Sequence, residues 1–181
     1  MKKIVIFSLN LGLLFLVTLL CKSWAQQTLA KGTAVIQGTQ AGSPITGTAN
    51  FEETAEGLKM DVQVFNVPPG KHGFHIHELG SCDDEGKAAG GHFNPAGVKH
   101  GFLPQDGHLN AHAGDAGNIL IDENGEGALS LTLPDVGLIN GKHNVEGKTV
   151  ILHEKEDDFG QPTGKAGGRI ACGIIQLTEG K

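Results

Sequence analysis

The chain has 181 residues, with 20 acidic and 14 basic side chains and a net charge of −6 when histidine is neutral. This length allows one ordinary domain that buries a core of its own. The acidic balance argues against nucleic acid or an anionic membrane surface as a binding partner.

The first 25 residues have the pattern of a secretory signal peptide. Two lysines precede an almost wholly apolar run over residues 4–20, and Ser23-Trp24-Ala25 places small residues at both specificity positions of a cleavage site. We expect residues 1–25 to be removed and residues 26–181 to form one domain of an exported protein, either periplasmic or secreted. The alternatives are an uncleaved membrane anchor and a lipoprotein attached through Cys21. Cleavage would remove three basic residues and no acidic one, which makes the net charge −9. We expect no stable membrane partner for the cleaved protein.

The remaining chain has the pattern of an all-β domain. Its many glycines and prolines indicate turns, and short β-branched runs lie between them. The clearest strand is 58–65, where Leu58, Met60, Val62 and Val64 alternate with polar residues. The expected strands are 33–37, 47–52, 58–65, 72–78, 118–121, 128–133, 149–153 and 170–177. Eight strands in about 156 residues predict a β-sandwich or flattened barrel without helices.

Two long stretches, 79–113 and 154–168, have no periodic pattern. Loops of this length inside a compact domain are usually functional or disordered. The first of them contains four histidines, His92, His100, His108 and His112. We therefore look for a site where these two loops meet the strands.

The strand before the first long loop carries two histidines on one face. His75 and His77 are two residues apart, so they share a face, while Phe74 and Ile76 point to the other face and anchor the strand. Two imidazoles at this spacing suit one copper or zinc ion. The alternative is a surface strand that carries two histidines by chance.

The first long loop and the residues just after it contain the ligands of a second site. His92, His100, His112 and Asp115 would make a closed tetrahedral zinc site of three histidines and one carboxylate. Such an ion would hold the loop against the strands. Each histidine taken singly is also explained as a solvated loop residue, but the whole set favours a metal site.

Three other histidines have structural interpretations. His72 falls on the face of Phe74 and Ile76, so we expect it in the core. His108 and His143 are expected to be exposed loop residues, although His108 could add a weak peripheral metal contact.

Two cysteines remain after cleavage, Cys82 and Cys172. An even count in an oxidising compartment predicts one disulfide, with two free buried thiols as the alternative. The bond would close a loop of about 90 residues, for which the chain-entropy account gives at most about 4–5 kcal/mol of stabilisation.

Five motifs in chain order extend these observations to nearly the whole predicted domain. They are Gly73-Phe-His-Ile-His-Glu, Gly91-His-Phe-Asn-Pro, His112-x-Gly-Asp115, His153-Glu-Lys-x-Asp157-Asp and Gly167-Gly-Arg-Ile-Ala-Cys172-Gly. In this set and order the chain resembles the copper/zinc superoxide dismutases. The short interval from His77 to Cys82 resembles the bacterial exported members of the family.

The resemblance implies a fold, two metals and a role for each matching residue. The implied fold is an eight-stranded Greek-key β-sandwich or flattened barrel with two long functional loops. The implied copper ligands are His75, His77, His92 and His153. The implied zinc ligands are His92, His100, His112 and Asp115, so that His92 bridges the two ions. Asp157 matches a carboxylate that hydrogen-bonds His75 and His100, and Cys82 and Cys172 match the family disulfide.

The implied activity is dismutation of superoxide to oxygen and hydrogen peroxide by a redox-cycling copper bridged through a histidine to a structural zinc. Arg169 and His92 match the catalytic residues: Arg169 orients the anion and His92 delivers a proton. Lys155 or Lys165 would help to steer superoxide. A homodimer is expected, with a monomer as the alternative. The alternative function is a non-catalytic exported protein that buffers or delivers copper and zinc.

Overall fold

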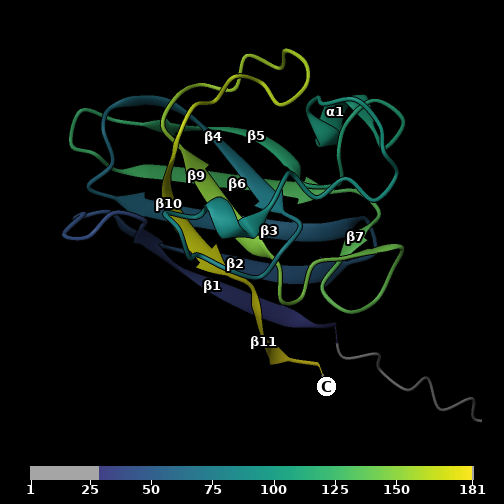
Figure 1. The fold of residues 1–181 in the computed structure, drawn as a ribbon. Helices are drawn as coiled ribbons and strands as arrows, with labels where there is room; N and C mark the ends of the chain where they lie inside the picture. Colours follow the sequence, from purple (N-terminus) through teal and green to yellow (C-terminus); the bar gives the residue numbers. More distant parts are fainter. Residues whose placement is uncertain (1–28, 181) are drawn as a thin grey trace, which may run out of the picture.

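The alternating pattern of residues 58–65 forms strand β3 (Gly57–Phe65) in the computed structural model, which describes residues 29–180 (Figure 1). The alternating apolar side chains of β3 are all buried, because this strand presents one face to the barrel interior. The other strands are β1 (Lys31–Gly38), β2 (Thr46–Thr54), β4 (Gly70–His77), β5 (Asp115–Ile121), β6 (Gly127–Leu133), β7 (Val136–Gly137), β8 (His143–Asn144), β9 (Thr149–His153), β10 (Arg169–Ile174) and β11 (Gln176–Glu179).

Nine of the strands form one antiparallel sheet that closes on itself, and β7 and β8 form a separate pair. The order of the sheet is β10-β9-β4-β5-β6-β3-β2-β1-β11, and β1 also pairs with β10. Strand β3 pairs with β6 rather than with β4, which gives the crossover of a Greek key. The predicted all-β barrel of eight main strands is therefore confirmed.

The structure differs from the predicted elements in three places. The predicted strand 170–177 is two strands, because Ile175 exchanges backbone hydrogen bonds with the segment at Gly147 and Lys148 instead of continuing along β1. The short parallel pair β7–β8 was not predicted, since two-residue strands are too short to show a period. The first long loop contains two single-turn helices, a 3₁₀ turn at Lys87–Ala89 and α1 at Leu103–Asp106.

The barrel core lies on the inner side of β4. Phe74 and Ile76 are fully buried in the main hydrophobic cluster, as predicted for their face of the strand. His72 is also buried, and its ring nitrogens lie 2.8 and 2.9 Å from the carbonyl oxygens of His153 and Pro68. The expectation of a core histidine at position 72 is confirmed.

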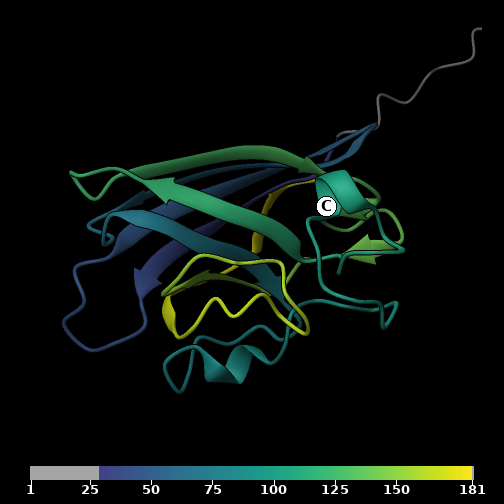
Figure 2. The ribbon, with the colours of Figure 1, turned by 90° about the horizontal axis from the view of Figure 1, so that it is seen from above.

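The two long loops lie together on the outside of the barrel, over β4 and β9. Figure 2 shows the loop after β9 (yellow-green) beside the segment that follows β4 (teal). Gly73 of β4 donates a 2.8 Å hydrogen bond to the carbonyl of Lys155 in the second loop. The second loop is therefore anchored to the strand that carries His75 and His77.

The predicted disulfide is present between Cys82 and Cys172, whose Cα atoms are 5.9 Å apart. It joins the start of the first long loop to β10, across a sequence separation of 90 residues. The Thr149 hydroxyl supports the same loop by donating a 2.7 Å hydrogen bond to the carbonyl of Leu79.

We expect Cys82→Ser to lower the free energy of unfolding by about 2–5 kcal/mol under oxidising conditions, because the unfolded chain regains the freedom of a long open loop. Denaturant unfolding of the oxidised proteins measures the difference. The double variant Cys82→Ser/Cys172→Ser should match the single variant, and reduced wild-type protein should approach both. An unshifted unfolding midpoint would contradict a stabilising role for the bond.

Candidate metal centre

Strand β4 brings His75 and His77 to the outer face of the barrel. Its pairing with β5 is interrupted by a bulge between Gly73 and His75, so the strand bends just before the two histidines. Both side chains are buried beneath the long loops. The two histidines that the sequence predicted on one face of a strand therefore both lie in the site.

The first long loop is joined to β4 by backbone hydrogen bonds. Phe93 N donates to Ile76 O over 2.8 Å, and Ile76 N donates to Gly114 O over 2.9 Å. An isolated β-bridge pairs His77 with His92. A Cβ atom at Gly114 would lie 2.1 Å from Ile76 O, so only glycine permits this approach. These contacts carry the loop histidines to the strand histidines.

Four buried histidines form the first donor set, which we call the four-histidine group. Its members are His75, His77, His92 and His153. Each offers a ring nitrogen, and these atoms lie within 4.8 Å of one another. The ring centroids of His75 and His92 are 4.1 Å apart, and the Nε2 atoms of His77 and His153 are 3.3 Å apart.

Three histidines and a carboxylate form the second donor set, which we call the carboxylate group. Its members are His92, His100, His112 and Asp115. The Nδ1 atoms of the three histidines lie 2.9, 2.8 and 3.1 Å, in that order, from the oxygens of Asp115. Asp115 is fixed at the start of β5, where its Oδ2 accepts hydrogen bonds from the backbone of Gly101 and His112. His92 belongs to both groups.

Asp157 contacts one histidine of each group. Its Oδ2 lies 2.8 Å from His75 Nε2, and its Oδ1 lies 2.9 Å from His100 Nε2. The Asn118 side chain holds the Asp157 backbone, donating to its carbonyl and accepting from its N–H over 2.9 and 2.7 Å. Gly164 passes so close that a Cβ would lie 1.7 Å from Asp157 Oδ1, so the loop requires glycine there. One carboxylate thus orients one histidine of each group.

Burial favours the neutral form of three members of the four-histidine group, His77, His92 and His153. It lowers the pKa of His77 to about 2 and the pKa of His153 to about 3, and neighbouring histidines add to the effect. Burial also lowers the pKa of His92 to about 4, although the hydrogen bond to Asp115 opposes it. Neutral imidazole is the form that ligates a metal ion.

In the carboxylate group, the surroundings favour the charged forms of His100 and Asp115. Burial would lower the pKa of His100, but its contacts with Asp115 and Asp157 outweigh burial and raise the pKa to about 9. Burial also opposes ionisation of Asp115, yet its contacts with His100, His112 and His92 hold the pKa of Asp115 well below the usual range. The buried carboxylate is thus stabilised only by positive charge or hydrogen-bond donors around it.

The donor atoms fit a metal ion in each group. The Nδ1 atoms of His75 and His100 are buried and accept or donate no hydrogen bond, although buried polar atoms almost always do. His100 Nδ1 lies 2.8 Å from Asp115 Oδ2 without hydrogen-bond geometry, as two ligands of one ion would. The other ring nitrogen of each histidine is held by Asp157, which is the usual arrangement of a metal-binding histidine.

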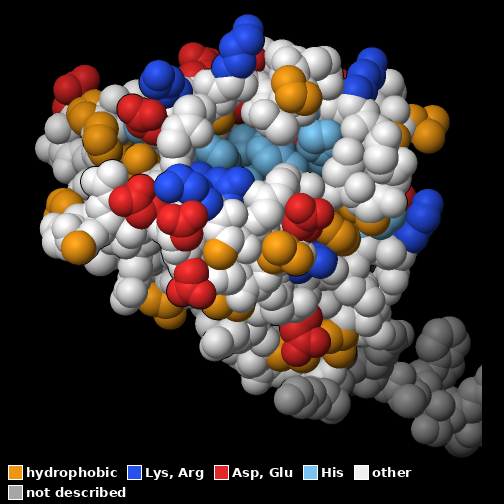
Figure 3. All heavy atoms as spheres, viewed as in Figure 1, with side chains coloured by type: hydrophobic (Ala, Val, Ile, Leu, Met, Phe, Trp, Pro, Cys, Tyr) orange, Lys and Arg blue, Asp and Glu red, His pale blue; other side chains and the backbone are white. Residues whose placement is uncertain are grey.

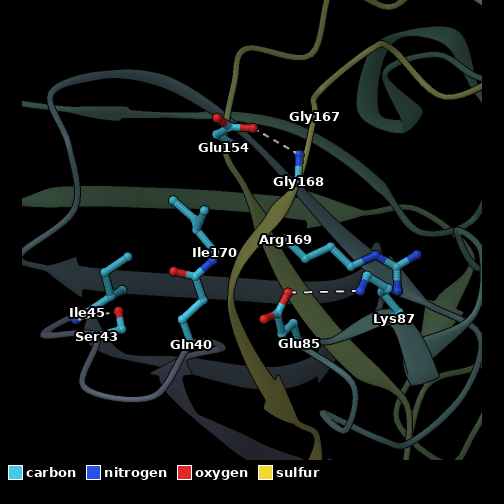
Figure 4. A pocket seen from close by; sticks show the side chains of 10 residues that line it. All are labelled: Gln40, Ser43, Ile45, Glu85, Lys87, Glu154, Gly167, Gly168, Arg169 and Ile170. Atoms are coloured by element: carbon cyan, nitrogen blue, oxygen red, sulfur yellow. Dashed lines mark hydrogen bonds and ion pairs between the residues drawn. The ribbon is translucent and has the colours of Figure 1, made fainter.

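Arg169 lies beside the four-histidine group on β10. Its guanidinium donates hydrogen bonds to the carbonyl oxygens of Gly86 and Gly90, in the loop that the disulfide anchors. The side chain lines a surface hollow of about 570 Å³ together with Lys87 and Glu154 (Figure 4). Figure 3 shows histidine side chains on the floor of this face, with basic side chains next to them. An anion entering this hollow would meet the fixed cation of Arg169.

Two residues that hold the site were not found from the sequence. The first is Asn118, described above. The second is Gln161, whose Oε1 accepts a 3.0 Å hydrogen bond from His100 N and whose Nε2 donates a 2.8 Å hydrogen bond to His100 O. Neither residue belongs to a ligand motif. Each side chain instead hydrogen-bonds backbone atoms of a residue that is distant in the sequence.

The expected surface position of His143 is wrong. His143 is 5% exposed on β8, whereas His108 is half-buried next to it. The pairing of β7 with β8 turns the His143 side chain inward, and this pairing was not predicted.

Comparisons with known proteins agree with this site. Residues 45–175 match the family model for copper/zinc superoxide dismutase. The chain is 36% identical over 165 residues to the extracellular superoxide dismutase [Cu-Zn] of Caenorhabditis elegans, covering 86% of this chain and 73% of the relative. It is 37% identical over 157 residues to superoxide dismutase [Cu-Zn] 2 of Brassica juncea, covering 82% of this chain and 99% of the relative.

A solved structure supports the same relationship. The crystal structure of the clock protein EA4 aligns with a TM-score of 0.72 at 36% identity, covering 82% of this chain and 95% of that chain. The region that matches the family model, residues 45–175, includes both donor groups and Arg169. The chain therefore belongs to the copper/zinc superoxide dismutase family.

Proposed function

We propose that this protein dismutates superoxide to oxygen and hydrogen peroxide with one copper and one zinc ion per chain. The observation that carries the proposal is the sharing of His92 between two buried donor groups, next to an arginine that lines a surface hollow. A protein that only buffers or delivers metal needs neither the shared histidine nor the guanidinium, so this alternative is the weaker one.

The ligand chemistry supports an assignment of each metal. The four-histidine group, His75, His77, His92 and His153, offers only nitrogen, which suits copper. The carboxylate group, His92, His100, His112 and Asp115, has the donor set and closure of a structural zinc site. Copper, when bound, supplies a one-electron redox couple, whereas zinc supplies a fixed positive charge without redox chemistry.

His92 is the residue that we assign to proton delivery. Its Nδ1 faces Asp115 over 2.9 Å, so its Nε2 is the nitrogen on the side of the four-histidine group. A proton held at Nε2 is within the buried site and can pass to the reduced product, as a general acid requires. The Asp115 contact fixes the ring in the orientation that this transfer needs.

Arg169 is the residue that we assign to substrate binding. Superoxide is an anion and the chain is acidic overall, so an attractive region must be local. The two carbonyl contacts of Arg169 fix the guanidinium beside the histidines, where it can hold a small anion. Lys165 is paired with Asp158 at 3.1 Å, whereas Lys155 forms no ion pair among residues 29–180. We therefore favour Lys155 as the second steering cation.

Gln161 should control how long the zinc ion stays bound, because its two hydrogen bonds join the second long loop to the backbone of His100. We expect Gln161→Ala to lose zinc to a chelator about ten-fold faster than wild type. Gln161→Glu keeps the acceptor but not the donor, so its rate should be intermediate. Gln105→Ala is the matched control, since Gln105 and Gln161 both line a second surface hollow beside His100, and the Gln105 side chain forms no hydrogen bond within the described residues. Equal zinc loss from all four proteins would contradict this role.

The proposal extends to export and assembly. The relationship to an extracellular enzyme supports secretion, and residues 1–25 fit a signal peptide ahead of a domain at 26–181, although positions 1–28 lie outside the described residues. Among residues 29–180, no helix is long and apolar enough to cross a membrane. A periplasmic or extracellular homodimer is the form that we propose. Amino-terminal sequencing of exported protein and sedimentation analysis test these two points.

A superoxide-removal assay on the purified mature protein tests the function. Metals are counted per chain in the same sample, and the protein is assayed with copper and zinc, with zinc alone and without metal. Activity that requires copper is expected. Protein that holds one copper and one zinc but leaves superoxide untouched would favour the metal-buffering alternative.

A further inference from the structure

Buried nitrogen atoms without hydrogen bonds mark a second place in the described chain besides the two donor groups. Four buried side-chain nitrogen or oxygen atoms of residues 29–180 lack a partner, and all four are imidazole nitrogens. Two of them are the Nδ1 atoms of His75 and His100 in the donor groups, and the other two are Nδ1 and Nε2 of His143. Burying a polar ring without any partner is costly, so His143 requires an explanation.

The neighbour of His143 is another histidine. The rings of His108 and His143 have centroids 4.6 Å apart and planes inclined by 36°. Ring pairs within the four-histidine group are separated by 4.1 to 5.9 Å, so the spacing of His108 and His143 is compatible with a common donor set. Two imidazoles at this separation can bind one ion side by side.

The orientation of His108 also suits a metal ligand. Its Nε2 lies 2.7 Å from the carbonyl oxygen of Pro134, which can only accept, so Nε2 carries the proton and donates. Nδ1 is then the nitrogen with a free lone pair. A backbone carbonyl holding one ring nitrogen while the other is free is the common arrangement of metal-binding histidines.

The pair is separate from the donor groups. His143 lies on β8, and His108 follows α1, whereas the donor groups lie over β4 and β9. Phe93 links the pair to the donor groups. It follows His92 in the sequence, and its ring meets the ring of His143 edge-on at a centroid distance of 6.4 Å. The half-buried His108 leaves the pair a route to solvent.

We propose that His108 and His143 form a second metal site, which binds one borderline divalent cation and takes Cu²⁺ most tightly. Two imidazoles suit Cu²⁺, Ni²⁺ and Zn²⁺, and Cu²⁺ is the tightest binder of this series at a nitrogen site. With two protein ligands, the remaining positions are filled by water, so the ion exchanges more readily than one in a closed site. The ion satisfies one nitrogen of His143, whose ring makes no hydrogen bond among residues 29–180.

The test uses full-length mature protein already loaded with one copper and one zinc per chain. Additional Cu²⁺ is titrated by equilibrium dialysis, and paramagnetic resonance of the added copper reports its nitrogen ligands. Wild-type protein should bind one further copper with a two-nitrogen signature. His108→Ala should weaken this binding by about ten-fold or more while superoxide turnover stays unchanged.

Two more variants complete the test. His143→Phe removes the nitrogens but keeps an aromatic ring in the buried position, and it should lose the extra copper as His108→Ala does. Leu109→Ala, at a neighbouring residue that is 85% exposed, should bind as wild type. Failure of wild type to take up a third ion, or equal uptake by His108→Ala, would overturn the site. Failure to load the first two ions would instead count against the proposed function, so the two failures are distinguishable.

Discussion

Arg169→Ala should lower kcat/KM for superoxide by about 100-fold while leaving both metals bound. The guanidinium donates to the carbonyl oxygens of Gly86 and Gly90 and forms no hydrogen bond with a ligand side chain among residues 29–180. It reaches the ligands only indirectly, through Gly90 O, which lies 3.0 Å from His77 Nδ1, so we expect little effect on metal retention. What is lost is the fixed cation that draws an anion into an acidic protein. Metal analysis and pulse-radiolysis or competition kinetics on the same preparation measure the two properties separately.

The control variants for this prediction lie in the same hollow. Lys87→Ala removes a neighbouring positive charge that already lies near Asp84 and Glu85, so its effect should be small. Arg169→Lys keeps the charge but not the planar pair of donors, and it should recover part of the rate. The salt dependence of the rate should also flatten in Arg169→Ala. Unchanged turnover in this variant would show that the proposed guidance role is wrong.

Asp157→Asn should weaken metal retention at both sites, with zinc affected most, by about 10- to 100-fold. The carboxylate contacts His75 through one oxygen and His100 through both, at 2.8 to 3.0 Å, and both histidines need an acceptor there. An amide presents one acceptor and one donor, so it can orient only one of the two rings. His75 is held by β4 in any case, whereas His100 lies on a loop, which is why zinc should suffer more.

Metal content after dialysis against a chelator measures this effect. Asp158→Asn is the matched control, because Asp158 is the adjacent carboxylate, is exposed, and contacts Lys165 and Gly160 instead of a histidine. We expect Asp158→Asn to retain metal as wild type does. Unaltered zinc and copper in Asp157→Asn would remove the case for Asp157 as the residue that orients both rings.

The sequence predicted those parts of the site that depend on short intervals. His75 and His77 share a face because a strand has a period of two, and the interval from His112 to Asp115 brings both to one group. Periodicity likewise predicted most of the barrel strands, since each needs one buried face. Local patterns of this kind can be read from neighbouring residues without knowledge of any long-range contact.

The parts that were missed depend on contacts between distant segments. Asn118 contacts the Asp157 backbone across 39 residues, and Gln161 contacts the His100 backbone across 61 residues. An amide that binds a backbone carries no ligand spacing, so only the folded arrangement reveals it. The burial of His143 depends on a pair of two-residue strands, and no sequence period can be read over two residues.

The placement of the core on one face of β4 and of the ligands on the other has a consequence for the metal-free protein. Phe74 and Ile76 pack inside the barrel without any contribution from the cations, whereas the loops at 79–113 and 154–168 cover the ligand face. Removing the ions should therefore speed amide hydrogen exchange in those loops and leave the exchange of β2, β3 and β6 unchanged. A chain of this design can fold its barrel first and acquire its ions afterwards, with the loops as the last part to become rigid.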